Sequence, residues 1–122
     1  MTDGRTRRPA YGWAALGAGN GAVAVLAGAF AAHALTDPIA IDLLDTGARW
    51  QVVSGLAAIV AGRMGAALSS AFHGLGALLF AGSLYALAVG APSIIGVVTP
   101  IGGAAMVFGW LALALIMLRG RS

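Results

Sequence analysis

Long apolar runs, separated by short polar stretches, dominate this chain. The run from Ala66 to Val89 contains no Asp, Glu, Lys or Arg. It exceeds the roughly 18 residues that are needed to cross the hydrocarbon core of a bilayer. Comparable runs predict four spans, at about residues 11–35, 48–67, 66–89 and 95–118. The pattern therefore predicts an all-α fold, an integral membrane four-helix bundle.

The polar ends of the chain are expected to be short tails, residues 1–10 and 119–122, and the first of them is expected to be disordered. Arg7 and Arg8 precede the first apolar run, so a twin-arginine export signal is one interpretation. We favour an uncleaved first span, because the run over 11–35 is longer than the apolar part of a signal peptide, about 7–15 residues.

The stretch after the first span predicts a helix start. Asp37 can cap this helix, and Pro38 suits its first position. Residues 39–46 alternate apolar residues with two aspartates, which predicts a short amphipathic segment in the first outer loop. Gly47 is then expected to bend the chain into the second span. Before the last span, Pro100 either begins the regular helix or kinks it.

Composition narrows the class of protein. Hydrophobic residues make up 60% of the chain and charged residues only 9%, and the mean hydropathy is +0.92. A soluble domain usually carries about a quarter charged residues. The seven arginines are too scattered to form a basic face, so nucleic acid is not an expected partner. The chain has no cysteine, which excludes disulfides and thiolate metal sites.

The arginines also predict the orientation. In a four-span topology six of them fall on one side, and only Arg49 falls on the other side together with three aspartates. Positive residues concentrate on the cytoplasmic side of membrane proteins, so both termini are expected in the cytoplasm. The six are Arg5, Arg7, Arg8, Arg63, Arg119 and Arg121.

Small residues in the spans predict close helix packing, either within the bundle or against a partner. We expect Gly21, Gly28, Gly82 and Gly103 to lie at helix contacts rather than to face lipid. Asn20 lies near the middle of the first span. A helix-to-helix hydrogen bond is the favoured interpretation of this residue, and a ligand contact is the alternative.

Polar residues of all four spans are expected to gather toward the outer leaflet. Such a cluster is either an outward-facing binding site or an internal hydrogen-bond network that fixes the order of the helices, and we favour the network. Arg49 is expected to turn inward, with its charge balanced by Asp45 or by backbone carbonyls. The candidate binding residues are His33, Arg49, Gln51, Ser83, Tyr85 and Thr99.

No catalytic or metal-binding pattern is visible. The two histidines, His33 and His73, are expected at different depths, so one metal ion cannot bind both. No Ser-His-Asp arrangement is evident, and the chain has no Glu of the kind that small multidrug exporters carry in their first span. His73 is the only group inside the cytoplasmic half that could titrate near neutral pH, and a neutral packing role is favoured.

Four sequence blocks resemble one family. They are Gly28-Ala-Phe-Ala-Ala-His-Ala-Leu35, Arg49-Trp-Gln51, Leu79-Phe-Ala-Gly-Ser-Leu-Tyr-Ala-Leu87 and Thr99-Pro-Ile-Gly-Gly103 with Gly109-Trp110. In this order, over roughly residues 21–118, they resemble the domain-of-unknown-function 423 family of small four-span bacterial inner-membrane proteins. The resemblance implies no activity, cofactor or catalytic residue, but all six candidate residues fall on the family's blocks.

Two positions depart from the family pattern. The resemblance implies Tyr-Gln, two further residues and then a His in the second span, but here Trp50-Gln51 leads to Ser54. His73 stands where the family usually has an apolar residue. The two positions are expected at depths about 10 Å apart, which argues against an exchange of roles.

The sequence thus predicts a multi-pass protein of the bacterial inner membrane that is not an enzyme and needs no cofactor. We expect an accessory or scaffold component whose partners are membrane lipids and either another membrane protein or further copies of itself. The alternative is a small transporter or binder of an apolar or anionic ligand, with the polar cluster around Arg49 as its site.

Overall fold

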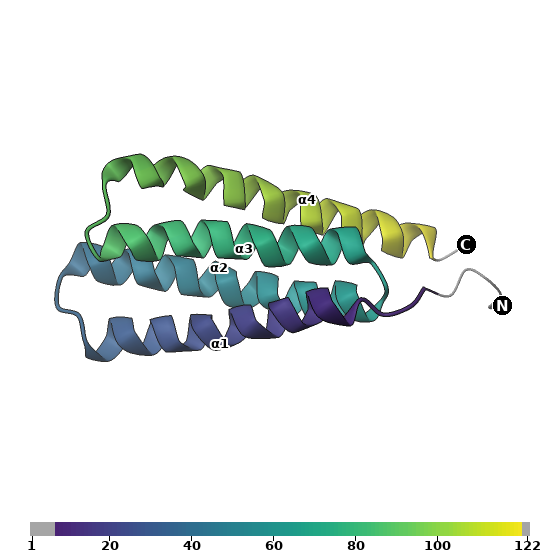
Figure 1. Cartoon of the computed structure of the whole chain (residues 1–122), viewed down its shortest axis with the longest axis horizontal. Helices are drawn as coiled ribbons and strands as arrows, with labels where there is room; N and C mark the ends of the chain where they lie inside the picture. The colour runs from purple at the N-terminus through teal and green to yellow at the C-terminus, as the bar shows by residue number, and fades with distance from the viewer. Residues whose placement is uncertain (1–6, 121–122) are drawn as a thin grey trace.

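A computed structural model describes residues 7–120 of the chain as four long antiparallel helices (Figure 1). They are α1 (Tyr11–His33), α2 (Pro38–Arg63), α3 (Ala67–Ala88) and α4 (Val98–Arg119), and a short 3₁₀ helix, η2 (Ser93–Val97), leads into α4. The described residues contain no strand. The prediction of an all-α four-helix bundle is confirmed.

The helices pack mainly in chain order. α1 lies against α2, α2 against α3 and α3 against α4, while α1 also contacts α3. α4 contacts α2 at only a few points, so it rests chiefly on α3. The start of α1 and the end of α4 lie at the same end of the bundle (Figure 1).

The bundle is apolar on the outside and small or polar on the inside. Its most buried positions include Ala58, Ala61, Ala77 and Ala81, each with no exposed surface. Large apolar side chains such as Leu26, 69% exposed, cover the exterior. A water-soluble bundle would bury such side chains, whereas lipid solvates them and small residues let the helices approach.

Three segments are long and apolar enough to cross a membrane: Tyr11–His33, Ala67–Ala88 and Ser93–Arg119. α2 is not among them, because charged residues interrupt its apolar pattern. The second span therefore remains a prediction, although α2 is long enough to cross at about 39 Å, the rise of a 26-residue helix.

The start of α2 confirms one prediction made from the sequence and contradicts another. The Asp37 carboxylate accepts a hydrogen bond from the Ala40 amide (3.3 Å), and Pro38 occupies the first helical position, as predicted. The expected separate amphipathic segment over 39–46 is wrong, because these residues form the first turns of α2. Gly47 does not bend the chain. Its lack of a side chain accommodates Tyr85, whose Cε1 would lie 2.7 Å from an added Cβ.

Residues 7–10 pack against the turn between α2 and α3. The Ala10 amide donates a hydrogen bond to the Gly62 carbonyl (2.7 Å). Gly65, which has a φ of 77°, lies so close to Arg7 that an added Cβ would overlap the Arg7 Cβ. The expected disorder is therefore wrong for residues 7–10, and residues 1–6 lie outside the described part.

The entry to α4 shows how Pro100 fits. α4 begins at Val98, and Pro100 falls in its first turn, where the missing amide removes no intrahelical hydrogen bond. Thr99 does not cap the helix but faces α3. The preceding turn contains Gly90, whose φ of 100° favours glycine.

The expected glycines lie at helix contacts only in part. The Gly21 amide nitrogen on α1 would lie 3.4 Å from an added Cβ on Gly55 of α2, and an added Cβ on Gly103 would lie 3.8 Å from the Phe80 ring of α3, so these two lie beside neighbouring helices. An added Cβ at Gly28 or Gly82 would meet no atom within 4 Å, so the expectation is wrong for these two. The tightest approaches lie at other glycines. An added Cβ on Gly17 would lie 2.6 Å from the Gly55 carbonyl, between α1 and α2. Between α3 and α4, an added Cβ on Gly102 would overlap the Phe80 amide nitrogen.

Candidate functional site

A chain of hydrogen bonds joins α1, α2 and α3 through three side chains. The Tyr85 hydroxyl donates to Gln51 Oε1 (2.6 Å), and Gln51 Nε2 donates to Asn20 Oδ1 (2.9 Å). Asn20 Nδ2 in turn donates to the carbonyls of Leu16 (3.0 Å) and Gly74 (3.2 Å). Asn20 and Gln51 are each 1% exposed. Their amide oxygens and at least one hydrogen of each amide group are engaged within the bundle.

Serine side chains form further hydrogen bonds between α3 and its neighbours α2 and α4. Ser70 Oγ donates to the Ala58 carbonyl on α2 (2.7 Å), and Ser69 Oγ donates to the Gly109 carbonyl on α4 (2.8 Å). Ser83 shares a hydrogen bond with Thr99 on α4. In a low-dielectric interior such bonds satisfy groups that would be costly to bury alone. These hydroxyls fix neighbouring helices to one another.

One link ties α2 to α4 directly. Ser54 Oγ donates to the Met106 sulfur (2.8 Å). The contact places Ser54 less than one helical turn along α4 from Gly109, against which the His73 ring packs. The expected depth separation of Ser54 and His73, about 10 Å, is therefore too large.

His73 is buried between α3 and α4 without a polar partner. It has no exposed surface, and neither ring nitrogen has a hydrogen-bond partner. Its ring packs edge-on against Trp110 (4.8 Å between centroids, 84° between planes). The absence of a side chain at Gly109 makes room for it, since an added Cβ would lie 2.8 Å from the ring. These contacts agree with the packing role favoured from the sequence.

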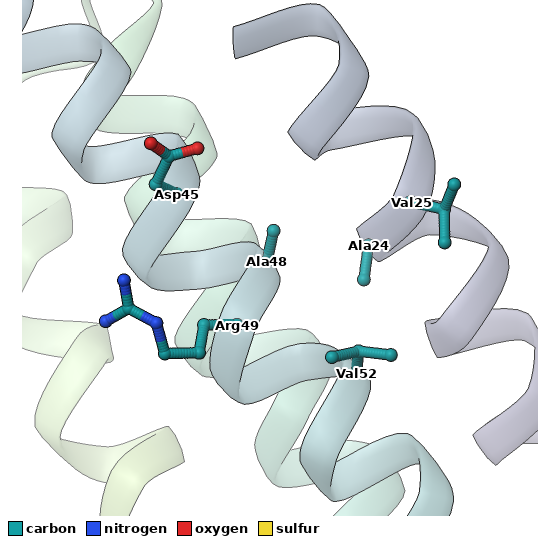
Figure 2. Close-up of a pocket in the computed structure, with 6 residues that line it drawn as sticks. All are labelled: Ala24, Val25, Asp45, Ala48, Arg49 and Val52. Atoms are coloured by element: carbon teal, nitrogen blue, oxygen red, sulfur yellow. The ribbon is translucent and has the colours of Figure 1, made fainter. Parts of the chain in front are cut away.

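Arg49 lies apart from this polar interior. Its side chain is exposed, and it makes no hydrogen bond or ion pair with any other described residue. Figure 2 shows the Arg49 side chain extending away from α1, with the Asp45 carboxylate one turn away on the same helix. The expected inward turn of Arg49 and its pairing with Asp45 are therefore wrong.

Asp45 and Arg49 border a shallow surface depression of about 300 Å³ between α1 and α2, and the Arg49 guanidinium extends away from it (Figure 2). Apart from them the depression is lined by alanine and valine. The apolar lining residues are Ala24, Val25, Ala48 and Val52.

The six candidate residues thus divide into three groups. Gln51 bonds to Tyr85, and Ser83 bonds to Thr99, so two pairs form as parts of helix-to-helix links. His33, at the end of α1, and Arg49 are exposed. Sequence reasoning did not include Asn20 in the cluster, although it takes part in three of the four hydrogen bonds of this chain. The sequence signal for this role was a side-chain amide near the middle of an apolar span.

The end of the bundle that holds the α2–α3 turn carries a different polar contact. Arg63 at the end of α2 donates a hydrogen bond to the Tyr11 hydroxyl, and its guanidinium lies over the Tyr11 ring (5.4 Å to the centroid). Both side chains are exposed. An arginine and a tyrosine at helix ends are typical of the boundary between lipid and water.

Comparisons with known proteins identify relatives across bacteria. Residues 27–103 match a family described as "Protein of unknown function (DUF423)". The chain is 36% identical to a UPF0382 membrane protein of Staphylococcus epidermidis, over 85% of this chain and 93% of that protein. It is 38% identical to a UPF0382 membrane protein of Haemophilus influenzae, over 78% and 84% of the two chains. It is 36% identical to the UPF0382 inner membrane protein YgdD of Escherichia coli, over 75% and 77%. No solved structure matches.

Proposed function

The chain belongs to the DUF423 family of bacterial membrane proteins, and from this premise we propose that it is a non-catalytic, multi-pass component of the inner membrane. In this proposal it acts as an accessory or scaffold protein, through its exterior and not through an internal site. Its partners are lipids and either another membrane protein or further copies of the chain.

The proposal rests on the hydrogen bonds that the interior polar groups make with one another. Gln51 and Tyr85 bond to each other, and the Ser83 and Thr99 hydroxyls bond to each other. A ligand at these positions would have to break hydrogen bonds that hold the helices together, and breaking them without replacement is costly in lipid. Reactive chemistry needs a group that is free to meet a substrate, and these four are engaged.

The charge distribution supports an orientation with both termini in the cytoplasm. The ends of α2 and α4 carry Arg63 and Arg119, and Arg7 and Arg8 lie beside the α2–α3 turn at the same end. The opposite end, which holds the α1–α2 connection, carries Asp37 and Asp42. Positive residues concentrate on the cytoplasmic side, so the aspartate end is assigned to the outside.

The test is purification of the full chain from bacterial membranes in a mild detergent, followed by native mass spectrometry. We expect a complex that contains a second membrane protein or several copies of the chain. The variant Gln51→Leu should lower the stability of the chain but leave the composition of the complex unchanged. A chain that runs only as a monomer, or a small molecule whose retention requires Gln51, would overturn the proposal.

A further inference from the structure

Three arginines are held around the turn between α2 and α3. Arg7 and Arg8 lie so close to Gly65 in this turn that an added Cβ there would overlap atoms of both. Arg63 ends α2 two residues before Gly65, and it donates a hydrogen bond to the Tyr11 hydroxyl. All three arginine side chains are exposed. The tertiary structure therefore brings residues 7 and 8 next to residue 63.

The end of α4 adds a fourth arginine. Ile116 packs against a core cluster that contains Ala66 of the α2–α3 turn, and Arg119 ends α4 three residues later. The end of α4 and the start of α1 lie at the same end of the bundle (Figure 1). The three aspartates of the described part belong to the opposite half, on α2 and the connection before it. We call this group the basic end, and it consists of Arg7, Arg8, Arg63 and Arg119.

The basic end lies outside the hydrocarbon core in the membrane arrangement proposed above. α1 and α4 have 23 and 22 residues, which corresponds to lengths of about 35 and 33 Å. Both lengths exceed a core of about 30 Å, so the helix ends reach the level of the lipid headgroups. Tyr11 and Trp13 are exposed here, as is typical of aromatic side chains at the boundary between lipid and water. The guanidinium groups are thus placed at the level of the lipid phosphates.

An apolar depression of about 520 Å³ begins beside the basic end. It runs along the first turns of α1, and its lining starts at Ala10, two residues after Arg8. The other lining residues are Gly12, Trp13 and Leu16. In a bilayer this surface can hold an acyl chain whose headgroup lies at the arginines. A soluble polyanion would bind the arginines without occupying the depression.

We propose that the basic end binds an anionic phospholipid of the phosphatidylglycerol type, with its phosphate between Arg63 and the arginines before α1 and an acyl chain along Trp13. Guanidinium groups form charge-assisted hydrogen bonds with phosphate oxygens, and clustered arginines at the membrane surface attract anionic lipid. Phosphatidylethanolamine fits less well. Its ammonium group would lie among four positive side chains, and no described residue at this end supplies a carboxylate. The inference names a lipid partner for the proposed function and rests on the membrane arrangement given there.

The experiment is native mass spectrometry of the full chain, purified in a mild detergent that contains equal amounts of phosphatidylglycerol and phosphatidylethanolamine with identical acyl chains. We expect phosphatidylglycerol to be retained in about tenfold excess, and this excess should fall as the ammonium acetate concentration rises, because salt screens exposed charges. The double variant Arg7→Gln, Arg8→Gln should lower its retention about tenfold. Glutamine keeps the Cβ that packs against Gly65, so the fold should be retained. Arg49→Gln removes an exposed arginine outside the basic end, and as the matched control it should have no effect.

A second variant tests the apolar part with every charge kept. Gly12→Leu fills the depression, and a Cβ added at Gly12 meets no atom within 4 Å, so the packing of the bundle is not disturbed. It should lower the retention of phosphatidylglycerol several-fold. Gly82→Leu, at a position that is equally open but outside the depression, is its control and should have no effect.

Three results would overturn the inference. They are equal retention of the two lipids by the unmodified chain, unchanged retention after the double arginine substitution, and unchanged retention after Gly12→Leu. The last of these, together with a loss in the arginine variant, would indicate a soluble polyanion as the ligand. Lipid retention is measured on the isolated chain, so the failure of the scaffold role, seen as a chain that runs only as a monomer, would leave this result unaffected.

Discussion

The Tyr85 hydroxyl donates a 2.6 Å hydrogen bond to Gln51 Oε1 while the edge of its ring fills the space left by Gly47. One residue of α3 is thus held by two positions of α2 that lie one turn apart. Gln51 passes the link to Asn20 on α1, so the rotation of three helices about their axes is coupled.

Removal of the Tyr85 hydroxyl should destabilise the bundle. In Tyr85→Phe, Gln51 Oε1 loses its donor and stays buried, and we expect the free energy of unfolding in detergent to fall by about 0.5–1.5 kcal/mol. Thermal or denaturant unfolding of the purified chain measures it. Tyr11→Phe is the control. Its hydroxyl accepts a bond from the exposed Arg63, so the loss should be smaller. A larger loss for Tyr11→Phe would contradict the structure.

Two glycines of α1 should respond differently to the same substitution. In Gly17→Ala the new Cβ would lie 2.6 Å from the Gly55 carbonyl, so we expect a loss of about 1–3 kcal/mol from overpacking. In Gly28→Ala the new Cβ meets nothing within 4 Å, and the higher helix propensity of alanine should leave stability unchanged or slightly raised. Melting temperatures of the two variants, measured side by side, decide this. Equal effects would mean that α1 and α2 do not cross at Gly17.

Replacement of His73 by an apolar residue should stabilise the protein. Its two ring nitrogens are buried without partners, and His73→Leu removes the cost of their desolvation, about 1–3 kcal/mol. Loss of the edge-on contact with Trp110 offsets part of this gain, about 0.5–1.5 kcal/mol. Unfolding in detergent measures the net change, and His33→Leu on the exposed end of α1 is the control. A clear loss of stability in His73→Leu would show that the nitrogens have a partner in the native protein.

The orientation of the bundle is open to a direct test, because the chain contains no cysteine. Single cysteines at Asp42 and Gly120 report on its two ends. We expect a membrane-impermeant thiol reagent to label Asp42→Cys in intact cells and to label Gly120→Cys only after the membrane is opened. Labelling of position 120 from outside intact cells would reverse the proposed orientation.

The positions of Gly17 and Gly28 show which structural features the local sequence pattern can predict and which it cannot. That Gly17 and Gly28 belong to a membrane helix followed from the apolar run around them. Which of them contacts α2 did not, because both the interior and the lipid-facing side of such a helix are apolar. The periodic contrast that marks the buried face of a soluble helix is absent, so the rotation of each helix about its axis could not be read from the pattern.

The sequence by itself determined that the chain is a helical membrane protein with four long helices. It also determined that Asp37 caps α2 and that polar groups lie inside the bundle. These follow from the hydropathy of each segment and from chemistry within one turn of the chain. Only the tertiary structure decided that residues 39–46 continue into α2, that Gln51 joins Asn20 to Tyr85, and that Arg49 faces outward. Each of these depends on the rotation and relative position of helices that are far apart in the sequence. The packing of all four helices together determines both.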